Sequence, residues 1–330
     1  MIITRTPFRI SFFGGGSDYP AWFHEHGGVV VATTIDKYCY ISCRYLPPFF
    51  EHKYRVVYSK IENVQDPSEI QHPAVREILK YMHCTEGLEI HHDGDLPARS
   101  GLGSSSSFTV GLLNALMALN GQHISHEKLA SLAIDVEQNV IQENVGSQDQ
   151  ISAAYGGFNR IEFLRNGQFR VNPIILHRDR LDGLQGSLML FFTGLSRFAS
   201  EIAKSKIDNL LQRETEIKRM MEMADESISI LSGNGSLDEF GRLLDQGWQY
   251  KKSLSNKVST EEIDQIYSAA MEAGALGGKL LGAGGGGFML FFVRPESQRR
   301  VRERLKNLIH VPFRFENTGS RVVLYHPQGL

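Results

Sequence analysis

The chain of 330 residues carries 35 basic and 37 acidic side chains, so its formal net charge is −2. This balance argues against a protein that coats nucleic acid or anionic lipid, because such proteins carry a broad basic excess. Hydrophobic residues make up 42% and charged residues 22% of the chain, which excludes a disordered protein. At roughly 100–200 residues per domain, the length predicts two domains, each with its own core.

Cysteines are few, and no segment is apolar enough to enter a membrane. The three cysteines, Cys39, Cys43 and Cys84, favour a reducing compartment over a disulfide framework. The N-terminal stretch is interrupted by Arg5 and Pro7, so it does not resemble a signal peptide. No apolar run reaches the roughly 18 residues that a bilayer span requires. We therefore expect a soluble, cytoplasmic protein without a membrane or nucleic-acid partner.

Hydrophobic periodicity predicts both strands and helices in the first half of the chain. Phe8, Ile10 and Phe12 alternate with polar residues, which predicts a half-buried strand. Apolar residues at helical spacing predict a helix over 108–119, ended by Asn120 and Gly121, and a second helix over 129–140. Content of β-branched and aromatic residues predicts further strands at 28–44, 53–58 and 169–176.

The second half of the chain mixes the two kinds of element again. A long amphipathic helix is predicted from Ile207 to Leu231, and Ser259 with Glu262 forms a capping box that begins another helix. We expect one more helix through Val301 and Leu308. Strands are predicted at 188–193, 288–293, 311–315 and 320–325.

The order of these elements indicates the fold class and a domain boundary. Strands and helices do not alternate strictly, which favours an α+β fold over a doubly wound parallel sheet. The polar segment 178–183 is the predicted boundary, which divides the chain into domains 1–180 and 181–330.

The strongest chemical signal is the stretch PARSGLGSSSS at residues 97–107, which leads directly into a helix. Glycines let backbone amides approach a ligand closely, and a helix N-terminus presents N–H groups and a positive dipole end to an anion. The serine hydroxyls can also reach a metal ion. The alternative, a flexible Gly/Ser linker, does not explain why the stretch precedes a strongly periodic helix. We therefore interpret it as a phosphate-binding loop.

Two acidic residues and a second glycine loop add to this signal. Glu137 lies at the edge of an apolar helix stripe, where a carboxylate needs a cation, a metal or backbone donors. Asp149 follows Gly146 and Ser147 where a helix begins, so by itself it is better explained as a first-turn acid than as a functional residue. Residues 279–288, KLLGAGGGGF, form a loop whose backbone must approach another segment or a ligand.

Together, these stretches resemble one family. RTPFRISFFGGGSDY at 5–19, PARSGLGSSSS at 97–107 and KLLGAGGGGF at 279–288 resemble, in order, the three motifs of the GHMP small-molecule kinases. The resemblance implies a two-domain α+β fold in which the N-terminal domain binds nucleotide and the C-terminal domain is ferredoxin-like. It also implies ATP and Mg²⁺ as cofactors and a site between the domains.

The resemblance assigns roles to particular residues. Asp149 would accept or orient the sugar hydroxyl, Arg9 would hold Asp149, and Ser105 with Glu137 would bind Mg²⁺. The spacing of twelve residues from Glu137 to Asp149 matches the family. The nucleotide phosphates would be bound by Arg99, Ser100, Gly101, Leu102, Gly103, Ser104, Ser105 and Ser106. The sugar would lie against Gly15, Gly16, Asp18, Gly284 and Gly285.

A narrower resemblance suggests the substrate. Longer stretches, including ENVGSQDQ at 143–150, resemble the bacterial D-glycero-D-manno-heptose 7-phosphate kinases, which phosphorylate an anomeric hydroxyl. Gly14-Gly15-Gly16-Ser17 replaces the G-E-H-T of galactokinases, which makes galactose an unfavourable substrate. Because the chain has no general basic surface, a phosphate on the substrate needs local cations, and we hypothesise that Arg44 or Lys53 provides them. A solvated surface loop explains Arg44 and Lys53 equally well.

Two alternatives remain open at this point. A kinase for the anomeric hydroxyl of another sugar, such as fucose or galactose, would share the catalytic residues. A non-catalytic protein that senses ATP and sugar is disfavoured, because it would not need Arg9, Glu137 and Asp149 together.

Overall fold

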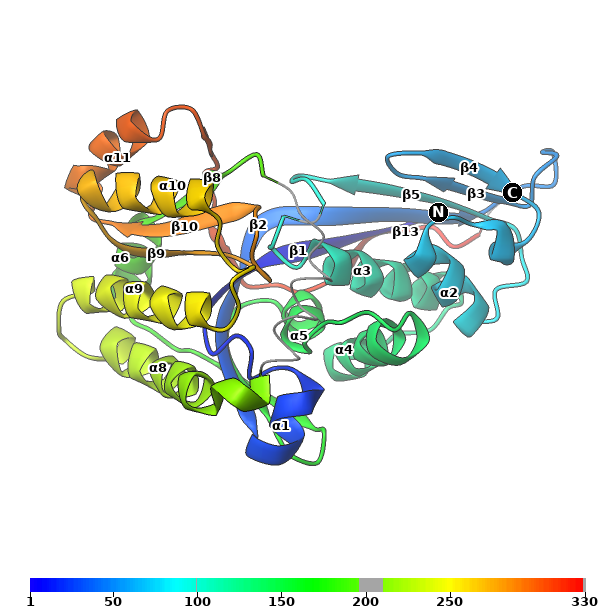
Figure 1. The fold of residues 1–330 in the computed structure, drawn as a ribbon. Coiled ribbons are helices and arrows are strands. Elements are labelled where there is room, and N and C mark those ends of the chain that lie inside the picture. Colours follow the sequence, from blue (N-terminus) through cyan, green and yellow to red (C-terminus); the bar gives the residue numbers. More distant parts are fainter. Residues whose placement is uncertain (99, 196–209, 329–330) are drawn as a thin grey trace.

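The computed structural model describes residues 1–98, 100–195 and 210–328, which form two β-sheets with their helices (Figure 1). The larger sheet has the strand order β13-β1-β2-β5-β3-β4, with β6, β7 and β12 attached beside β2. Its pairs are antiparallel except for β3 with β5. Its strands are β1 (Ile2–Phe13), β2 (Gly28–Tyr45), β3 (Tyr54–Val57), β4 (Ile61–Val64), β5 (Leu88–Gly94), β6 (Phe158–Phe163), β7 (Phe169–Pro173), β12 (Phe315–Glu316) and β13 (Arg321–Tyr325).

The long strands β1 and β2 form the centre of this sheet. The first half of β2 pairs with β6 through residues 28–33, and its second half pairs with β5 through residues 39–45. β1 follows β2 along both halves, with a register shift between Pro7 and Phe8. β1 ends at Phe13, directly before the first glycine run, and Arg9 lies in the second half of this strand.

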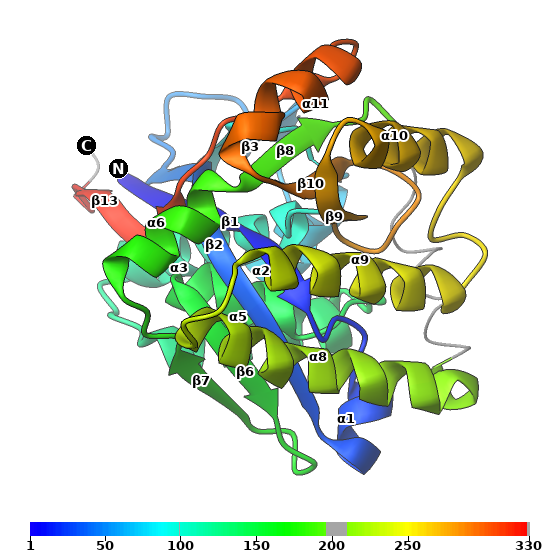
Figure 2. The same ribbon diagram turned by 90° about the vertical axis from the view of Figure 1, so that its left-hand side faces the viewer.

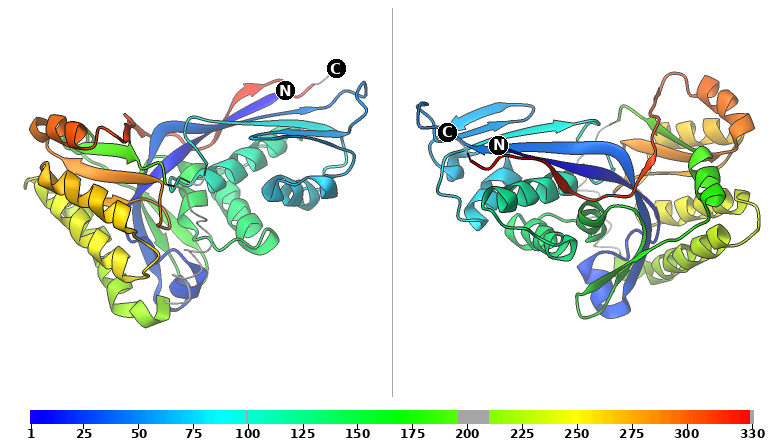
Figure 3. Two further views of the ribbon diagram at one scale, coloured as in Figure 1. Left: turned by 45° about the horizontal axis from the view of Figure 1, so that its top comes forward. Right: turned by 180° about the vertical axis from the view of Figure 1, so that it is seen from behind.

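Helices cover one face of the larger sheet (Figures 1 and 3). They are α2 (Pro73–Tyr81), α3 (Ser104–Leu119), α4 (His126–Asp135) and α5 (Gln148–Tyr155), with α1 (Pro20–His26) directly before the start of β2. The helix α3 packs against β1 and β2 and is buried on nearly all sides after its first turn, which explains why its sequence is apolar all round. A π-helix, η2 (Val136–Val140), continues α4, and a 3-10 turn, η1 (Pro67–Glu69), precedes α2.

The smaller sheet has the antiparallel order β11-β8-β10-β9, with strands β8 (Leu188–Phe192), β9 (Ala275–Leu280), β10 (Phe288–Val293) and β11 (Ile309–His310). Figure 2 shows α8 (Glu214–Ser232), α9 (Asp238–Ser253) and α10 (Glu261–Glu272), the helices between β8 and β9, stacked side by side. The helix α11 (Gln298–Arg304) joins β10 to β11. This arrangement is the β-α-β-β-α-β pattern of ferredoxin-like folds, so the predicted α+β architecture is confirmed.

The end of the chain returns to the larger sheet, where β12 pairs with β2 and β13 pairs with β1. The helix α6 (Arg178–Gly186) covers the whole of the segment 178–183 that was predicted as the domain boundary. The division at residue 180 stays a prediction. Two short 3-10 turns, η3 (Leu210–Arg213) and η4 (Pro295–Ser297), precede α8 and α11.

Several predicted elements differ from those in the structure. No strand covers residues 311–314: β11 ends at His310 and β12 holds only Phe315 and Glu316. The helix expected through Leu308 ends at Arg304. Thr260, not Ser259, caps α10, because its hydroxyl accepts a hydrogen bond from the backbone N–H of Ile263. The start of the helix predicted from Ile207 lies outside the described residues.

Among the described helices, none has the length and hydrophobicity that a membrane span requires. Cys39 and Cys43 are buried in β2, and all three cysteines have free thiols.

Candidate active site

The predicted phosphate-binding loop joins β5 to α3, so the N-terminus of α3 lies at this loop. Gly101 and Gly103 both have positive φ angles, of 84° and 75°, a conformation that favours glycine. No side chain caps α3, so the first-turn amides keep their capacity to bind an anion. Of the residues predicted to bind the nucleotide, Ser100–Ser106 form this turn, and Arg99 lies outside the described residues.

The third glycine-rich stretch packs directly against this loop, backbone to backbone. A Cβ atom at Gly101 would lie 2.5 Å from the carbonyl oxygen of Leu281, and one at Gly282 would lie 2.4 Å from the Cα of Gly101. Gly284 and Gly285 pack on Val258, whose carbonyl oxygen accepts a hydrogen bond from Gly285 at 3.0 Å. The close approach inferred from these glycines is therefore an approach to protein backbone.

Arg9 and Asp149 meet beside the loop. The guanidinium donates from Nε to Oδ1 of Asp149 at 2.7 Å and from Nη2 to Oδ2 at 2.9 Å. Its Nη1 donates to the carbonyl oxygen of Gly101 at 2.8 Å. The Arg9 side chain is 5% exposed and that of Asp149 is 25% exposed, so the carboxylate is the accessible member of the pair. The structure thus brings together the first two motifs and the D-Q sequence.

Asp18 lies next to this pair and is almost completely buried, at 2% exposure. Its Oδ1 accepts the backbone N–H of Gly16 and its Oδ2 accepts Nε2 of Gln148, both at 2.9 Å. Burial raises the pKa of Asp18, and the charge of nearby Asp149 adds to the effect. Gln148 was missed by sequence reasoning, although its place directly before Asp149 was a signal. Gly146 is required here, because a Cβ atom would lie 2.0 Å from Oδ2 of Asp18.

Glu137 is fully buried in the π-helix η2, beneath the first turn of α3. Its Oε2 accepts hydrogen bonds from Oγ of Ser106, at 2.8 Å, and from the Gln150 amide, whereas its Oε1 has no close hydrogen-bond partner among the described residues. The hydroxyl of Thr109 also faces the carboxylate and partly offsets the effect of burial on its pKa. Burial raises the pKa of Glu137 to about 7. Ser105, the hydroxyl predicted to bind metal, is exposed one position earlier.

These groups fit a magnesium ion bound together with phosphates. Mg²⁺ prefers oxygen ligands and commonly uses only one or two carboxylates, with substrate phosphates and waters completing its coordination. Glu137 supplies a buried carboxylate whose Oε1 has no close partner in the part of the chain that the structure describes, beside the serine hydroxyls of the phosphate-binding loop. Within the described residues there is no cluster of three or more His, Cys, Asp or Glu side chains that could hold a metal by themselves.

Arg44 and Lys53 do not join this group. Arg9 lies opposite Thr34 of β2, and Arg44 is ten residues farther along the same strand, which corresponds to roughly 30 Å. Arg44 is engaged there by Glu89, with Nε to Oε2 at 2.7 Å. Lys53 precedes β3, at the end of the sheet remote from α9 (Figure 1). The hypothesis that they bind a phosphate on the substrate stays a prediction, and it requires that phosphate to lie far from Asp149.

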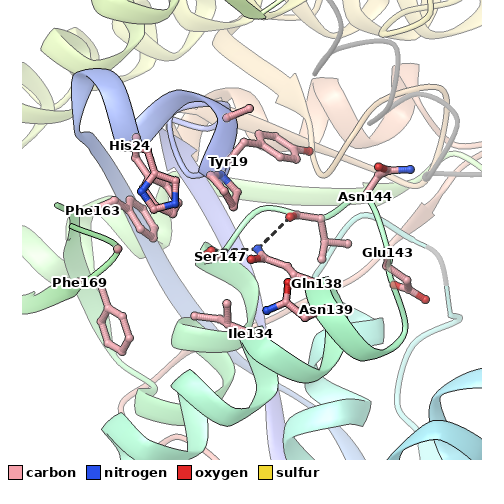
Figure 4. A pocket seen from close by; sticks show the side chains of 15 residues that line it. Tyr19, His24, Ile134, Gln138, Asn139, Glu143, Asn144, Ser147, Phe163 and Phe169 are labelled. Carbon is pink, nitrogen blue, oxygen red and sulfur yellow. Dashed lines mark hydrogen bonds between the residues drawn. The ribbon is translucent and has the colours of Figure 1, made fainter. Parts of the chain in front are cut away.

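A cavity of about 470 Å³ lies beside the site, between α1 and the loop from η2 to α5 (Figure 4). Gln138 in its wall donates from Nε2 to Oγ of Ser147 and to the carbonyl oxygen of Val145, both at 3.1 Å. Tyr19 and Ser147 also line the cavity, and each is adjacent in sequence to a residue of the Asp18–Gln148 pair. Arg9, Glu137 and Asp149 do not line it, so the predicted chemistry is located outside the cavity.

Comparison with known proteins agrees with this arrangement. The family model for the GHMP kinases N terminal domain matches residues 70–157, and that for the GHMP kinases C terminal matches residues 216–310. The two segments cover more than half of the chain and include the phosphate-binding loop, Glu137, Asp149 and the glycine loop. The chain belongs to the GHMP kinase superfamily.

Individual GHMP kinases resemble the chain over most of its length. A D-glycero-alpha-D-manno-heptose 7-phosphate kinase of Campylobacter jejuni is 29% identical, covering 92% of this chain and 93% of that protein. A bifunctional fucokinase/GDP-fucose pyrophosphorylase of Arabidopsis thaliana is 26% identical over 91% of this chain, which spans 30% of that protein. A crystal structure of a D-glycero-D-manno-heptose 1-phosphate kinase from Bacteroides thetaiotaomicron superimposes with a TM-score of 0.80 at 25% identity, covering 99% of this chain and all of that one.

Membership in the GHMP kinases makes this chain an ATP-dependent phosphotransferase. The predicted class of enzyme is thereby confirmed. The roles of its individual residues and its sugar are proposals, which are developed next.

Proposed function

We propose that this GHMP kinase transfers the γ-phosphoryl group of ATP to the anomeric hydroxyl of D-glycero-D-manno-heptose 7-phosphate, for the synthesis of nucleotide-activated heptose. The carrying observation is the Arg9–Asp149 ion pair, which lies against Gly101 of the phosphate-binding loop. The heptose is favoured by the relative from Campylobacter jejuni, which aligns with nearly the whole chain. Gly15 and Gly16 further support a substrate other than galactose, because they leave out the side chains of the galactokinase motif.

The residues act mainly by positioning and by charge. The transition state of phosphoryl transfer is loose, and its charge is spread over non-bridging oxygens. The amides of α3 would bind the nucleotide phosphates, and Arg9 would stabilise the charge on the transferred group. Both oxygens of Asp149 accept from Arg9, and each retains a further lone pair that can orient the sugar hydroxyl. Asp18 and Gln148 would bind other hydroxyls of the sugar.

Mg²⁺ would be held by Glu137 together with a serine hydroxyl of the first turn of α3. When bound, it neutralises charge on the phosphates. The ion also gives Glu137 the positive partner that a buried carboxylate requires. Without a cation, burial raises the pKa of Glu137 to about 7, so below this pH a proton takes the place of the cation.

One observation favours a second substrate. The fucokinase relative also aligns with 91% of this chain, so L-fucose is the competing sugar. The two proposals differ in the phosphate that the heptose already carries.

The test is an assay of ADP release with ATP, Mg²⁺ and a panel of sugars: the heptose 7-phosphate, the same heptose without phosphate, L-fucose and D-galactose. The proposal expects kcat/KM to be highest for the heptose 7-phosphate, with the new phosphate on the anomeric oxygen by ³¹P NMR. A higher kcat/KM for L-fucose would identify L-fucose as the substrate in place of the heptose. ATP binding without turnover of any sugar would contradict the kinase assignment.

A further inference from the structure

Lys251 is a buried lysine of α9, with 6% of its surface exposed. Its Nζ donates to two backbone carbonyl oxygens, that of Leu280 at 2.6 Å and that of Gly282 at 2.7 Å. Leu280 ends β9, and Gly282 lies just inside the glycine loop of residues 281–287. One ammonium group therefore holds the backbone at the junction between β9 and the glycine loop.

The glycine loop is in direct contact with the phosphate-binding loop. Gly282 and Gly101 are in backbone contact, and neither has a side chain that could absorb a shift. A second contact lies nearby, because the backbone N–H of Phe288 donates to the carbonyl oxygen of Ser100 at 3.2 Å. A displacement of Gly282 or of Phe288 would therefore act directly on Gly101 or Ser100.

From Gly101 the contacts continue to the acid of the site. Arg9 donates to the carbonyl oxygen of Gly101 with one nitrogen and holds Asp149 with two others. A continuous series of contacts thus runs from Lys251 through Gly282, Gly101 and Arg9 to Asp149. These residues come from α9, the glycine loop, the phosphate-binding loop, β1 and α5.

We propose that Lys251 is a positioning residue of this kinase, which holds the glycine loop against the phosphate-binding loop and so sets the amides of α3 for the nucleotide phosphates. Hydrogen bonds from an ammonium to carbonyl oxygens are charge-assisted and stronger than neutral ones, and burial strengthens them further. In this proposal the lysine acts through the backbone carbonyl groups of Leu280 and Gly282. The inference depends on ATP as the phosphoryl donor but not on which sugar accepts the phosphoryl group.

The experiment compares Lys251→Met with Lys252→Met. Lys252 is the next residue of α9, but its side chain is 29% exposed and its Nζ lies 3.5 Å from Asp264. The dissociation constant of a fluorescent ATP analogue is measured with Mg²⁺ and without sugar, together with the thermal unfolding midpoint. Lys251→Met should weaken nucleotide binding about tenfold or more, because it removes both charge-assisted hydrogen bonds that hold the glycine loop. Lys252→Met should stay within about twofold of the wild type.

A steady-state readout separates positioning from general loosening of the fold. In Lys251→Met the KM for ATP should rise while the KM for the best sugar substrate is unchanged. Equal increases in both KM values, or nucleotide binding equal to that of Lys252→Met, overturn the proposal. If Lys251→Met does not fold, Lys251→Arg serves instead, because a planar guanidinium does not reproduce two contacts from one nitrogen. Wild-type nucleotide affinity in Lys251→Arg then overturns the proposal. Because nucleotide binding is measured without sugar, failure of the heptose assignment leaves this test intact.

Discussion

Arg9 and Asp149 lie 140 residues apart in the sequence and form a bidentate ion pair in the structure. Gly103 makes room for this pair: a Cβ atom there would lie 3.2 Å from Cγ of Arg9 and 3.4 Å from Oδ2 of Asp149. The phosphate-binding loop is therefore shaped around both residues. This arrangement distinguishes Asp149 from an ordinary acid in the first turn of a helix.

Replacement of Asp149 by asparagine keeps the size of the side chain and removes its charge. We expect kcat to fall roughly 10²–10⁴-fold, the range typical of general acid–base groups, with little change in the affinity for ATP. Asp179→Asn is the matched control, because Asp179 is also a first-turn acid, in α6, but is 89% exposed. An Asp149→Asn enzyme with more than about a tenth of the wild-type kcat would show that Asp149 only supports its helix.

Glu137 makes stability depend on pH. With its pKa raised from 4.5 to about 7, the folded protein binds more protons at this residue than the unfolded chain does between these values. Raising the pH through this window without Mg²⁺ should therefore lower the free energy of unfolding, by on the order of 3 kcal/mol. Urea unfolding of the wild type and Glu137→Gln at several pH values measures the difference. Parallel pH profiles for the two proteins would contradict the assignment.

The raised pKa of Glu137 also predicts how the Mg²⁺ concentration for half-maximal rate depends on pH. Below about pH 7 the ion must displace a proton from Glu137, so the Mg²⁺ concentration for half-maximal rate should rise as the pH falls. In Glu137→Gln this concentration should be higher at every pH and lose most of its pH dependence. Titration of the rate with Mg²⁺ at pH 6 and pH 8 provides the measurement. An unchanged Mg²⁺ requirement in the variant points to a structural role.

Two neighbouring serines compete for the role of metal ligand. Ser105 was predicted from the sequence, but Ser106 is the hydroxyl that contacts Glu137. We expect Ser106→Ala to raise the Mg²⁺ requirement more than Ser105→Ala does, because only the former removes a group already held at the carboxylate. Mg²⁺ titration of both variants decides between them. A larger effect of Ser105→Ala restores the prediction made from the sequence.

Alanine substitutions at Gly101 and Gly121 distinguish the effect of steric crowding on stability from that of backbone strain. Both have positive φ angles, of 84° and 70°, but a Cβ atom at Gly101 would collide with Leu281 whereas one at Gly121 meets nothing within 4 Å. Gly121→Ala should cost about 1–2 kcal/mol of stability and spare ATP binding. Gly101→Ala should cost more and raise the KM for ATP. Equal losses of stability and no change in ATP binding would show that the two loops do not depend on this contact.

Arg44→Ala and Lys53→Ala test whether these two residues bind the phosphate of the substrate. Because both residues lie at the far end of the larger sheet, we expect kcat/KM to change by no more than about twofold for phosphorylated and unphosphorylated heptose alike. A loss confined to the phosphorylated sugar would place its phosphate at these residues after all. Comparison of the two sugars with each variant is therefore sufficient.

The sequence by itself determined the local features of this protein. The glycines and serines of residues 100–106 predicted a helix N-terminus that can bind an anion, and α3 begins there because helix initiation is decided within a few residues. The spacing of Glu137 and Asp149 and the order of the three glycine runs were likewise visible. These signals are local because turns, caps and hydrophobic periodicity depend on neighbouring residues.

The tertiary structure alone decided which distant residues meet. Strand register along β2 places Thr34 beside Arg9 and carries Arg44 away from the site, although both lie in one continuous strand. The π-helix η2 places Glu137 next to Ser106, whereas Ser105 was the serine predicted from the sequence to bind Mg²⁺ with it. Gly101 and Gly282, like Lys251 and its carbonyl partners, meet only when the two sheets pack together. Such contacts join segments whose local sequences carry no information about each other, so they arise from register and packing.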